Sequence, residues 1–353
     1  MSIKNKIILI ISIVLILILI SIIVYYAYKK LKSELFSTVP VVTFPFKNLY
    51  DENHNLLNII LISAPFREVN HEQLYEEYKA KGLYFCGISS YLNFPGVINN
   101  PYEDKFHMER KHDYTQMVTA WLHCFRPDKI PDNLLNSKLP MELITEADLK
   151  DTDNESFKIQ TEKEYDFMYC CLEDNKKCEA GWQSINRNWD LAKKCLEVMC
   201  GKFKLKGVLV GRTNCEFTDK CNGIVKILPF LSYPEFQKEM QKCKFLFVPN
   251  IIDASPRIIA EAICYNMPVL VNYNILGGWH NVISGVTGEF FTDENNIINS
   301  LSTIIDNYNT YEPRKWFTSN RGAKITGRIL AQFLKKCYPN INNKEMQYAT
   351  ITI

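Results

Sequence analysis

The chain has 353 residues, of which 47% are hydrophobic and 23% are charged, and its formal net charge is +2. This is the composition of a globular protein, and the length suffices for two domains that each have a core of their own. The near-neutral charge argues against a dedicated nucleic-acid binder, because such a protein concentrates positive charge on one face.

The N-terminal segment is unlike the rest of the chain. Between residues 7 and 27 only Ser12 and Ser21 are polar. As a helix this segment spans about 30 Å, the thickness of a bilayer core. The alternative is a cleaved signal peptide, whose apolar region is shorter and ends in a small-residue cleavage site. We predict a single-pass membrane anchor over residues 7–27 within an anchor and stalk of residues 1–40. The flanking lysines nearly balance, so the side of the membrane stays open.

After the stalk the chain shows a strand-helix-strand pattern. Residues 56–63 are an apolar run of strand length, residues 71–81 form a polar helix that Gly82 ends, and residues 83–88 are a second strand. A unit of this kind builds a parallel sheet. We therefore predict that residues 41–140 form a small, reduced Rossmann-like domain.

Histidines are the chemically notable residues of this first domain. Residues 91–113 have a loop-like composition, and in them His107 and His112 are candidates for acid/base groups or for groups that orient an acceptor. A structural or solvent-facing histidine is the commoner case. His71 and His123 fall in helical patterns and are weaker candidates, since residues 114–125 have the spacing of an amphipathic helix.

Residues 141–164 contain many acidic and few large apolar side chains, so we predict a linker there. Beyond it, strand-length apolar runs alternate with helical patterns, which predicts a second Rossmann-like domain over residues 165–338. The polar residues 339–353 are predicted to be a loose tail. The further strands expected in this domain are 165–171, 205–210 and 224–231, and the expected helices are 186–200, 234–243, 296–308 and 316–337.

The clearest unit of the second domain is again strand, helix and strand. Residues 244–249 and 268–273 are apolar runs typical of parallel strands that are buried on both faces. Between them we expect Ser255 as the N-cap of a helix, Pro256 as its first residue and Asn266 at its end. The loop before this helix then lies at the carboxyl edge of the sheet, where such folds bind ligands.

Acidic residues and glycines mark this unit. Asp253 precedes the helix, Glu261 follows eight positions later, and the pair Gly277-Gly278 comes after the second strand. In order and spacing the stretch resembles the donor site of the retaining nucleotide-sugar glycosyltransferases of family 4, the "group 1" transferases, which have the GT-B fold. Asp253 stands where that family has Glu, and Asn266 where it has Gly. The resemblance covers residues 165–337, and residues 56–90 more loosely. It implies that the loops of the first domain hold the acceptor, so residues 41–140 would be the acceptor-side domain.

The resemblance implies roles for these side chains. Glu261 would bind the ribose hydroxyls of the donor, Asp253 would lie near the transferred sugar, and Arg187 would neutralise the pyrophosphate. A carboxylate suits a vicinal diol, a guanidinium suits phosphate, and a helix N-terminus offers free N–H groups to anions. The family's second basic residue has no clean match; the candidates are Arg212, Lys176 and Lys177. Backbone groups that would hold the leaving phosphate and the donor belong to Ala254, Ser255, Pro256, Arg257, Gly277 and Gly278.

The cysteines and one sequon bear on the compartment. The chain has 12 cysteines, and Cys170, Cys171, Cys243 and Cys264 lie in apolar runs, where cysteine behaves as a small buried residue with a free thiol. This pattern favours a reducing compartment. The cysteines form no C-x-x-C pair, so we expect no structural zinc site. Asn154 begins a glycosylation sequon, which is usable only in a lumenal domain.

The sequence therefore predicts an α/β protein of the GT-B fold, with two Rossmann-like domains that face a cleft and an N-terminal membrane anchor. The expected activity is retaining transfer of a sugar from a nucleotide-sugar donor to a glycan, lipid or protein hydroxyl. No cofactor or metal ion is expected, because fixed donors can stabilise the leaving phosphate. The alternatives are a catalytically silent module that binds a glycan or a partner, and, among enzymes, an epimerase or phosphorylase.

Overall fold

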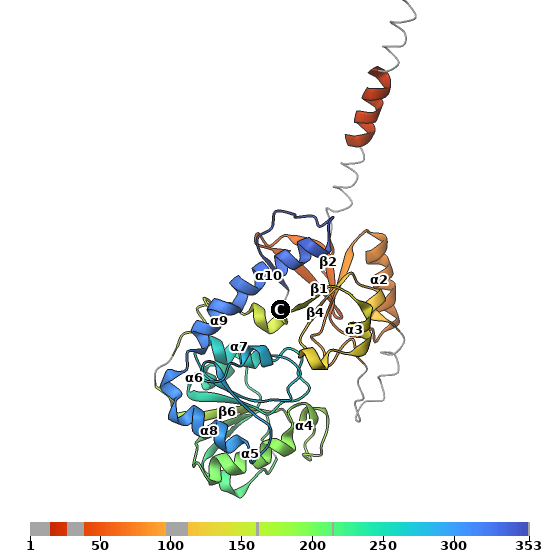
Figure 1. The fold of residues 1–353 in the computed structure, drawn as a ribbon. Helices are drawn as coiled ribbons and strands as arrows, with labels where there is room; N and C mark the ends of the chain where they lie inside the picture. The colour runs from red at the N-terminus through yellow and green to blue at the C-terminus, as the bar shows by residue number, and fades with distance from the viewer. Residues whose placement is uncertain (1–14, 27–38, 97–111, 160–161, 214, 352–353) are drawn as a thin grey trace, which may run out of the picture.

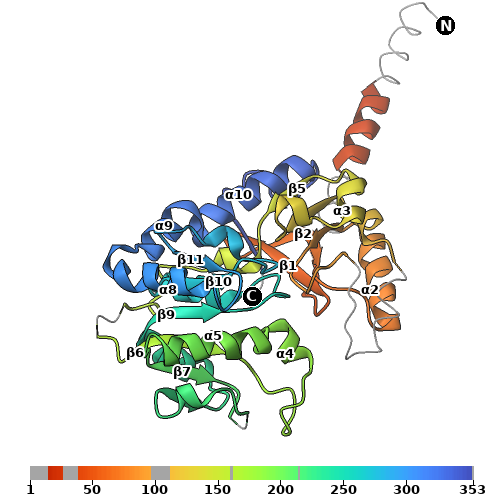
Figure 2. The same cartoon turned by 60° about the horizontal axis from the view of Figure 1, so that its bottom comes forward.

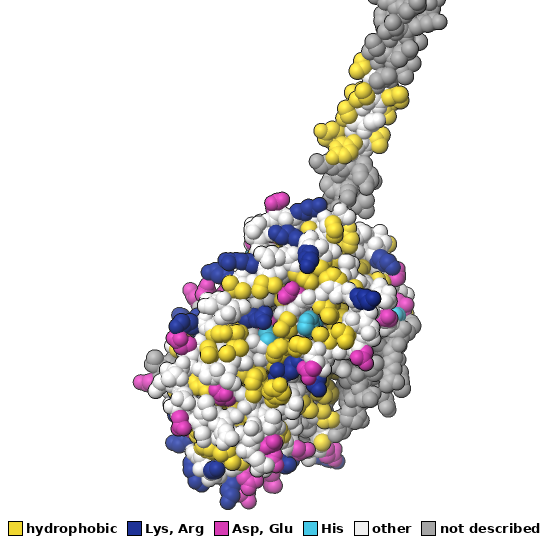
Figure 3. Space-filling view, viewed as in Figure 1, with side chains coloured by type: hydrophobic (Ala, Val, Ile, Leu, Met, Phe, Trp, Pro, Cys, Tyr) yellow, Lys and Arg dark blue, Asp and Glu magenta, His cyan; other side chains and the backbone are white. Residues whose placement is uncertain are grey.

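The computed structural model describes residues 15–26, 39–96, 112–159, 162–213 and 215–351. Figure 1 shows two α/β domains side by side, with the helix of residues 15–26 extending away from the first of them. The predicted anchor over residues 7–27 lies partly outside the described residues. Of the helices that are described, none is long and apolar enough to cross a bilayer. Large apolar side chains of residues 15–26 are exposed, and they cover the surface of this helix in Figure 3.

The first domain is built on a six-stranded sheet in the order β12-β1-β2-β3-β4-β5. Strands β2 to β5 are parallel, as expected for residues 56–88, while β1 is antiparallel to both of its neighbours. Helix α2 covers one face and the C-terminal helix α10 the other. The bounds are β1 Phe46–Asp51, β2 Leu56–Ile62, α2 Val69–Ala80, β3 Tyr84–Ile88, β4 Ala120–His123, α3 Asp132–Ser137, β5 Met141–Leu143 and β12 Ala349–Ile351.

Two predictions for this domain are wrong. The helix expected over residues 114–125 is instead a single 3₁₀ turn, Tyr114–Gln116, followed by strand β4. Strand β4 lies between β3 and β5, and its residues Ala120 to Leu122 are fully buried. A strand buried on both faces shows no alternation, so a short apolar run is compatible with either element. The expected linker also begins inside this sheet, because Met141–Leu143 is strand β5.

The second domain contains a six-stranded parallel sheet in the order β11-β10-β9-β6-β7-β8. Helices α5 and α8 pack on one face, and α6, α7 and α9 on the other, which gives a three-layer domain. The bounds are β6 Tyr165–Cys170, α4 Trp182–Asn186, α5 Trp189–Gly201, β7 Gly207–Val210, β8 Val225–Leu228, α6 Tyr233–Gln241, β9 Cys243–Val248, α7 Arg257–Cys264, β10 Val269–Asn272, β11 Gly288–Phe291 and α8 Ile297–Asp306.

This strand order fixes where a ligand can bind. From the adjacent strands β6 and β9, successive strands run outward in opposite directions. The connections that leave the carboxyl ends of β6 and β9 therefore diverge and open a crevice, the usual ligand site of a doubly wound sheet.

The C-terminal segment joins the two domains. Helices α9 (Pro313–Asn320) and α10 (Gly322–Cys337) replace the single helix expected over residues 316–337, because the chain breaks at Arg321. Figures 1 and 2 both show α9 beside the second domain and α10 crossing to the first. Leu330, Ala331 and Leu334 pack against the first sheet. The prediction of a loose tail is also wrong, because Ala349–Ile351 forms strand β12, which pairs with β1.

Four of the twelve cysteines form disulfides in the second domain. Cys178 is bonded to Cys215, and Cys200 at the end of α5 is bonded to Cys221. The four cysteines predicted as free thiols are indeed free. The disulfides nevertheless oppose the reducing compartment that the apolar cysteines suggested, because disulfides persist in oxidising environments.

Candidate active site

Helix α7 and the loop before it form the wall of the site. The helix has Pro256 as its N-cap, one residue later than the predicted cap Ser255. The Ser255 Oγ instead accepts a hydrogen bond from the backbone N–H of Ala147, at 3.1 Å. At the other end, Asn266 adopts a left-handed conformation with φ 57°. Asparagine tolerates this conformation better than most residues, which explains how it can stand where the related motif has glycine.

A cavity of about 420 Å³ opens at the predicted crevice, between β6, β9, α6 and α7. Three side chains that were predicted to contact the donor line it: Arg187, Asp253 and Glu261. Ser255 and Arg257, which were predicted to contribute backbone groups, line it as well. Arg187 lies on the connection between α4 and α5, far from the others along the chain. The fold therefore brings Arg187, Asp253 and Glu261, three of the predicted site residues, to one cavity.

Glu261 is 6% exposed and has two polar partners. Its Oε1 accepts a hydrogen bond from the Tyr233 hydroxyl at 3.1 Å, and it lies 2.9 Å from the Lys150 Nζ. Burial raises the pKa of Tyr233, and the neighbouring charge of Glu261 raises it further. The tyrosine hydroxyl thus stays protonated and donates to the carboxylate, which leaves the second carboxylate oxygen for a ligand.

Asp253 is paired in a similar way. The Arg187 Nη1 lies 2.6 Å from its Oδ2, and the Asn250 amide donates to the same oxygen at 3.1 Å. Charge-assisted bonds of this length hold both side chains in fixed positions. The site therefore contains two acid/base pairs, Asp253 with Arg187 and Glu261 with Lys150.

The loop with Gly277 and Gly278 is hydrogen-bonded to the backbone of Asp253. The backbone N–H of Gly277 donates to the Asp253 carbonyl at 2.9 Å, so this amide is not available to a donor molecule. A Cβ atom on Gly277 would stand 1.9 Å from the Ala254 carbonyl oxygen. Gly278 has φ +73°, and a Cβ there would stand 2.4 Å from the Pro256 ring. Both positions require glycine because the two loops touch through their backbones.

The other predicted side chains that the structure describes lie outside this cavity. Arg212 is fully buried outside the cavity, where it stacks on Trp189 and bonds Asp174 at 2.9 Å. It therefore holds the loop after β6 rather than a ligand. His112 packs against Phe66, with its Nε2 3.9 Å from a carboxylate oxygen of Glu72. His107 lies outside the described residues. The alternative lysines, Lys176 and Lys177, are exposed and do not line the cavity.

The sequence missed Lys150, which fell in the predicted linker. It follows a short 3₁₀ helix, η4 (Glu146–Leu149), which lies against α7 and α10. Asp148 anchors η4, since its Oδ1 is 2.8 Å from both the His280 Nε2 and the Asn281 Nδ2. Although burial alone would raise its pKa, the charge of His280 and these hydrogen bonds lower the pKa of Asp148 to about 2. No local sequence signal marks Lys150, because only the packing of η4 between the domains brings it to Glu261.

An apolar cavity of about 270 Å³ adjoins the first and shares Cys170, Arg187 and Tyr233 with it. Its remaining walls include Val210, Phe230, Leu231 and Phe236. The exposed ring of Phe230 stands at its rim. As for metals, the described part of the chain contains no group of three or more His, Cys, Asp or Glu side chains that could hold an ion.

No family model and no curated protein sequence matches the chain. Solved structures do match. A glycosyltransferase from Rickettsia africae has a TM-score of 0.55 at 12% identity, with 80% of this chain and 77% of that chain covered. The lipopolysaccharide outer core galactosyltransferase WaaB has a TM-score of 0.54 at 10% identity, with coverages of 79% and 75%. Anabaena HepE, solved with UDP and glucose, has a TM-score of 0.52 at 12% identity, with 78% of each chain covered. These similarities concern the fold, and they confirm the predicted GT-B architecture of two Rossmann-like domains.

Proposed function

We propose that the chain is a glycosyltransferase that transfers a sugar from a nucleotide-sugar donor to a hydroxyl acceptor, with retention of configuration, as the family 4 motif implies. One observation carries this proposal: Asp253, Arg187 and Glu261 line a single cavity at the switch point of a parallel sheet. The three similar solved structures support it, because two of them are glycosyltransferases and the third, HepE, was solved with UDP and glucose.

In this proposal each part of the donor has its own partner. Glu261 accepts hydrogen bonds from the ribose hydroxyls with its unused oxygen. The pyrophosphate lies at the N-terminus of α7, among the positive charges of Arg187, Lys150 and Arg257. The adjoining apolar cavity takes the flat nucleobase, with the exposed Phe230 ring at its rim.

The chemistry follows from the same charges. When the bond between the anomeric carbon and the phosphate oxygen breaks, negative charge builds up on the leaving diphosphate. Arg187 and Lys150 are already held near that position, so a small movement of their side chains lets them stabilise this charge. Binding of the donor would release Arg187 from Asp253, which frees this carboxylate for the hydroxyls of the transferred sugar. Because side-chain cations neutralise the phosphates, the proposal requires no metal ion.

We also propose that residues 7–27 anchor the protein in a membrane and that its folded body lies in an oxidising compartment. The apolar run supports the anchor. Two disulfides support the oxidising compartment. The sequon residue Asn154 is exposed, so an oligosaccharide transferase could reach it there.

A catalytically silent binding module is the second candidate, and one observation favours it. Both acids of the site already have basic partners, at 2.6 Å for Asp253 and 2.9 Å for Glu261. A cavity whose charges satisfy one another is stable without a ligand. A direct binding measurement therefore has to separate the two functions.

The test is the thermal stability of the full chain, purified in mild detergent, in the presence of UDP, GDP, ADP and their sugars. A ligand at a hundred times its dissociation constant stabilises the folded state by about 2.7 kcal/mol, which raises the melting temperature measurably. We expect one nucleotide to do so for the wild type and for Glu197→Gln, whose side chain is exposed on α5. Glu261→Gln should abolish most of the rise.

The outcomes separate the candidates. A nucleotide-dependent rise that needs Glu261, together with slow release of free nucleotide from the bound donor, supports the transferase. Cooperative melting that no nucleotide shifts would overturn the transferase and favour the silent module.

A further inference from the structure

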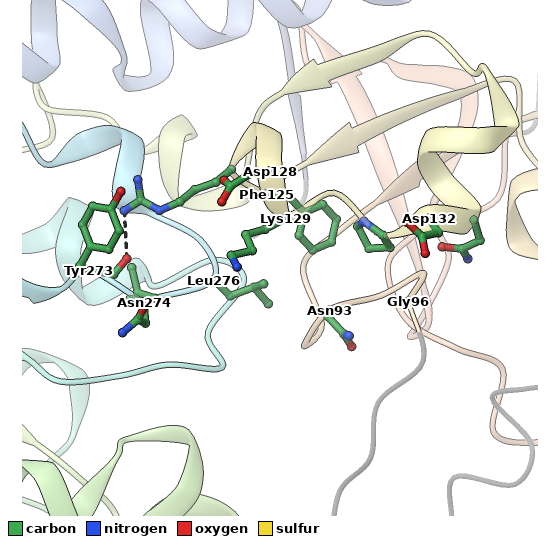
Figure 4. A pocket seen from close by; sticks show the side chains of 13 residues that line it. Asn93, Gly96, Phe125, Asp128, Lys129, Asp132, Tyr273, Asn274 and Leu276 are labelled. Carbon is green, nitrogen blue, oxygen red and sulfur yellow. Dashed lines mark hydrogen bonds between the residues drawn. The ribbon is translucent and has the colours of Figure 1, made fainter. Parts of the chain in front are cut away.

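A second and larger cavity lies between the two domains and plays no part in donor binding as proposed above. Its volume is about 570 Å³, within the range of ligand sites, and it shares no residue with the donor cavity. One wall is the segment of residues 125–133 that follows β4 in the first domain, and the opposite wall is the loop of residues 273–276 that follows β10 in the second. Figure 4 shows the two walls facing each other.

Several hydrogen-bonding side chains that line the cavity have no partner among the described residues. Asp128, Lys129, Asp132 and Asn274 line it and are exposed. Within the described ranges, none of these four side chains makes a hydrogen bond or an ion pair with the protein, whereas both acids of the donor cavity are paired. Charged and amide groups gathered in a concavity without internal partners are therefore free to bind a ligand.

Aromatic rings complete the walls. Tyr273 is 48% exposed, and Arg126 holds it in place, with its guanidinium 4.3 Å from the centre of the ring and its Nη2 3.1 Å from the Tyr273 carbonyl. This bond is the dashed line in Figure 4. The same guanidinium of Arg126 also lies 4.6 Å from the centre of the Trp279 ring. The buried ring of Phe125 forms part of the opposite wall. The exposed ring of Tyr273, fixed in this way, offers an apolar surface at little entropic cost.

The cavity lies one loop away from the proposed sugar-binding end of the donor site. The backbone N–H of Leu276 donates to the Ile251 carbonyl at 3.0 Å, and that of Gly277 to the Asp253 carbonyl at 2.9 Å. The loop that forms one wall of the cavity is therefore bonded directly to the loop that carries Asp253. A molecule in this cavity would lie beside the position assigned to the transferred sugar.

We propose that this cavity binds the acceptor and that the acceptor is a neutral saccharide; this inference rests on the proposed function. A saccharide presents C–H faces that suit aromatic rings and paired hydroxyls that suit carboxylate and amide groups. An acyl chain would not repay the desolvation of Asp128 and Asp132. Arg126 and Lys129 balance the charges of Asp128 and Asp132 in this lining, so the cavity has no net charge that would favour an acidic saccharide.

The experiment measures binding of the full chain in detergent to an array of neutral di-, tri- and tetrasaccharides, with acidic saccharides and phosphatidylcholine vesicles as further arms. The affinity for the best neutral saccharide is then measured for variants. We expect Asp132→Asn and Asn274→Ala each to weaken it by about tenfold, because each removes hydrogen bonds from a polar ligand. The matched control is Asp306→Asn, an exposed aspartate at the end of α8. Nucleotide binding should be unchanged in all three variants.

The possible results also separate this inference from the proposed function. Nucleotide binding without binding of any neutral saccharide, or saccharide binding that the two cavity variants do not weaken, would overturn the saccharide cavity and leave the transferase standing. Preference for vesicles or acidic saccharides would overturn it equally. Saccharide binding that depends on Asp132, without any nucleotide binding, would support the cavity and overturn the transferase. If neither ligand binds, both proposals fail.

Discussion

Lys150 is the residue whose role the structure changes most. Its side chain is 16% exposed and its ammonium group lies 2.9 Å from Glu261, so it adds a positive charge beside the donor cavity that Arg187 and Arg257 line. A cation held against a buried carboxylate is already placed for the phosphate of an incoming nucleotide, which it can reach through its flexible side chain.

We expect Lys150→Met to weaken nucleotide binding by about tenfold, because it removes a charge-assisted contact with the phosphates while keeping the length of the side chain. The measurement is the affinity of the full chain for the nucleotide that stabilises it best. Lys158→Met, at an exposed position of the same segment, is the matched control. Equal affinities in the two variants would show that Lys150 only neutralises Glu261.

At the level of single residues, the sequence could predict what one continuous stretch contains. The spacing of Asp253 and Glu261 and the place of Gly277 were readable, because a strand-helix-strand unit fixes their relative positions. Lys150 was not readable, since it reaches Glu261 only through the packing of η4 against α7. Arg212 was misleading for the opposite reason: it follows a strand, as phosphate-binding residues do, but its guanidinium is enclosed by Trp189 and Asp174.

Among the elements, strand β4 shows where prediction from the sequence fails and why. Its apolar residues fit a helical repeat as well as a strand, and only the neighbours β3 and β5 decide between them. This matters for the cavity between the domains, because Phe125 and Arg126, which follow β4 directly, line that cavity. A helix at this position would have placed these residues differently.

Strand β4 also places His123 near the domain boundary, and this gives a prediction of pH dependence. Burial, and then the nearby charge of His280, lower the pKa of His123 from 6.5 to about 4. The unfolded chain therefore binds a proton between pH 6.5 and 4 that the folded chain does not, so stability falls as the pH is lowered through this window. The loss amounts to at most about 3 kcal/mol.

The measurement is the melting temperature of the wild type at pH 7.5 and at pH 5. We expect His123→Gln, which cannot take up this proton, to lose less stability over that interval than the wild type. His54→Asn changes an exposed histidine of the same domain and serves as the control. An equal loss in His123→Gln and the wild type would contradict the prediction.

Considered as a whole, the molecule is held together by its last forty residues. Helix α10 crosses to the first domain and β12 completes the first sheet, so that strands β1 and β12, from opposite ends of the folded body, lie side by side. The sequence predicted a helix over residues 316–337 but not the strand. Ala349–Ile351 is only three residues long, and its partner β1 is some three hundred residues away, so no local pattern reveals the pairing.

The whole molecule also carries the evidence on its compartment, in the form of two disulfides in the second domain. The bond between Cys200 and Cys221 closes a loop with a sequence separation of 21 residues and ties α5 to the segment before β8. A disulfide around a loop of this size stabilises a domain by about 3 kcal/mol. If the body lies in an oxidising compartment, these bonds form in the cell, and Asn154 becomes accessible to glycosylation.

The measurement is alkylation of the full chain with a mass-tagged maleimide in denaturant, immediately after acid quenching of expressing cells. We expect eight cysteines to be labelled without reduction and four more after reduction, which together account for all twelve. In a eukaryotic host, Asn154→Gln should also remove a glycosidase-sensitive mass. Labelling of all twelve cysteines before reduction would place the body in a reducing compartment and contradict the proposal.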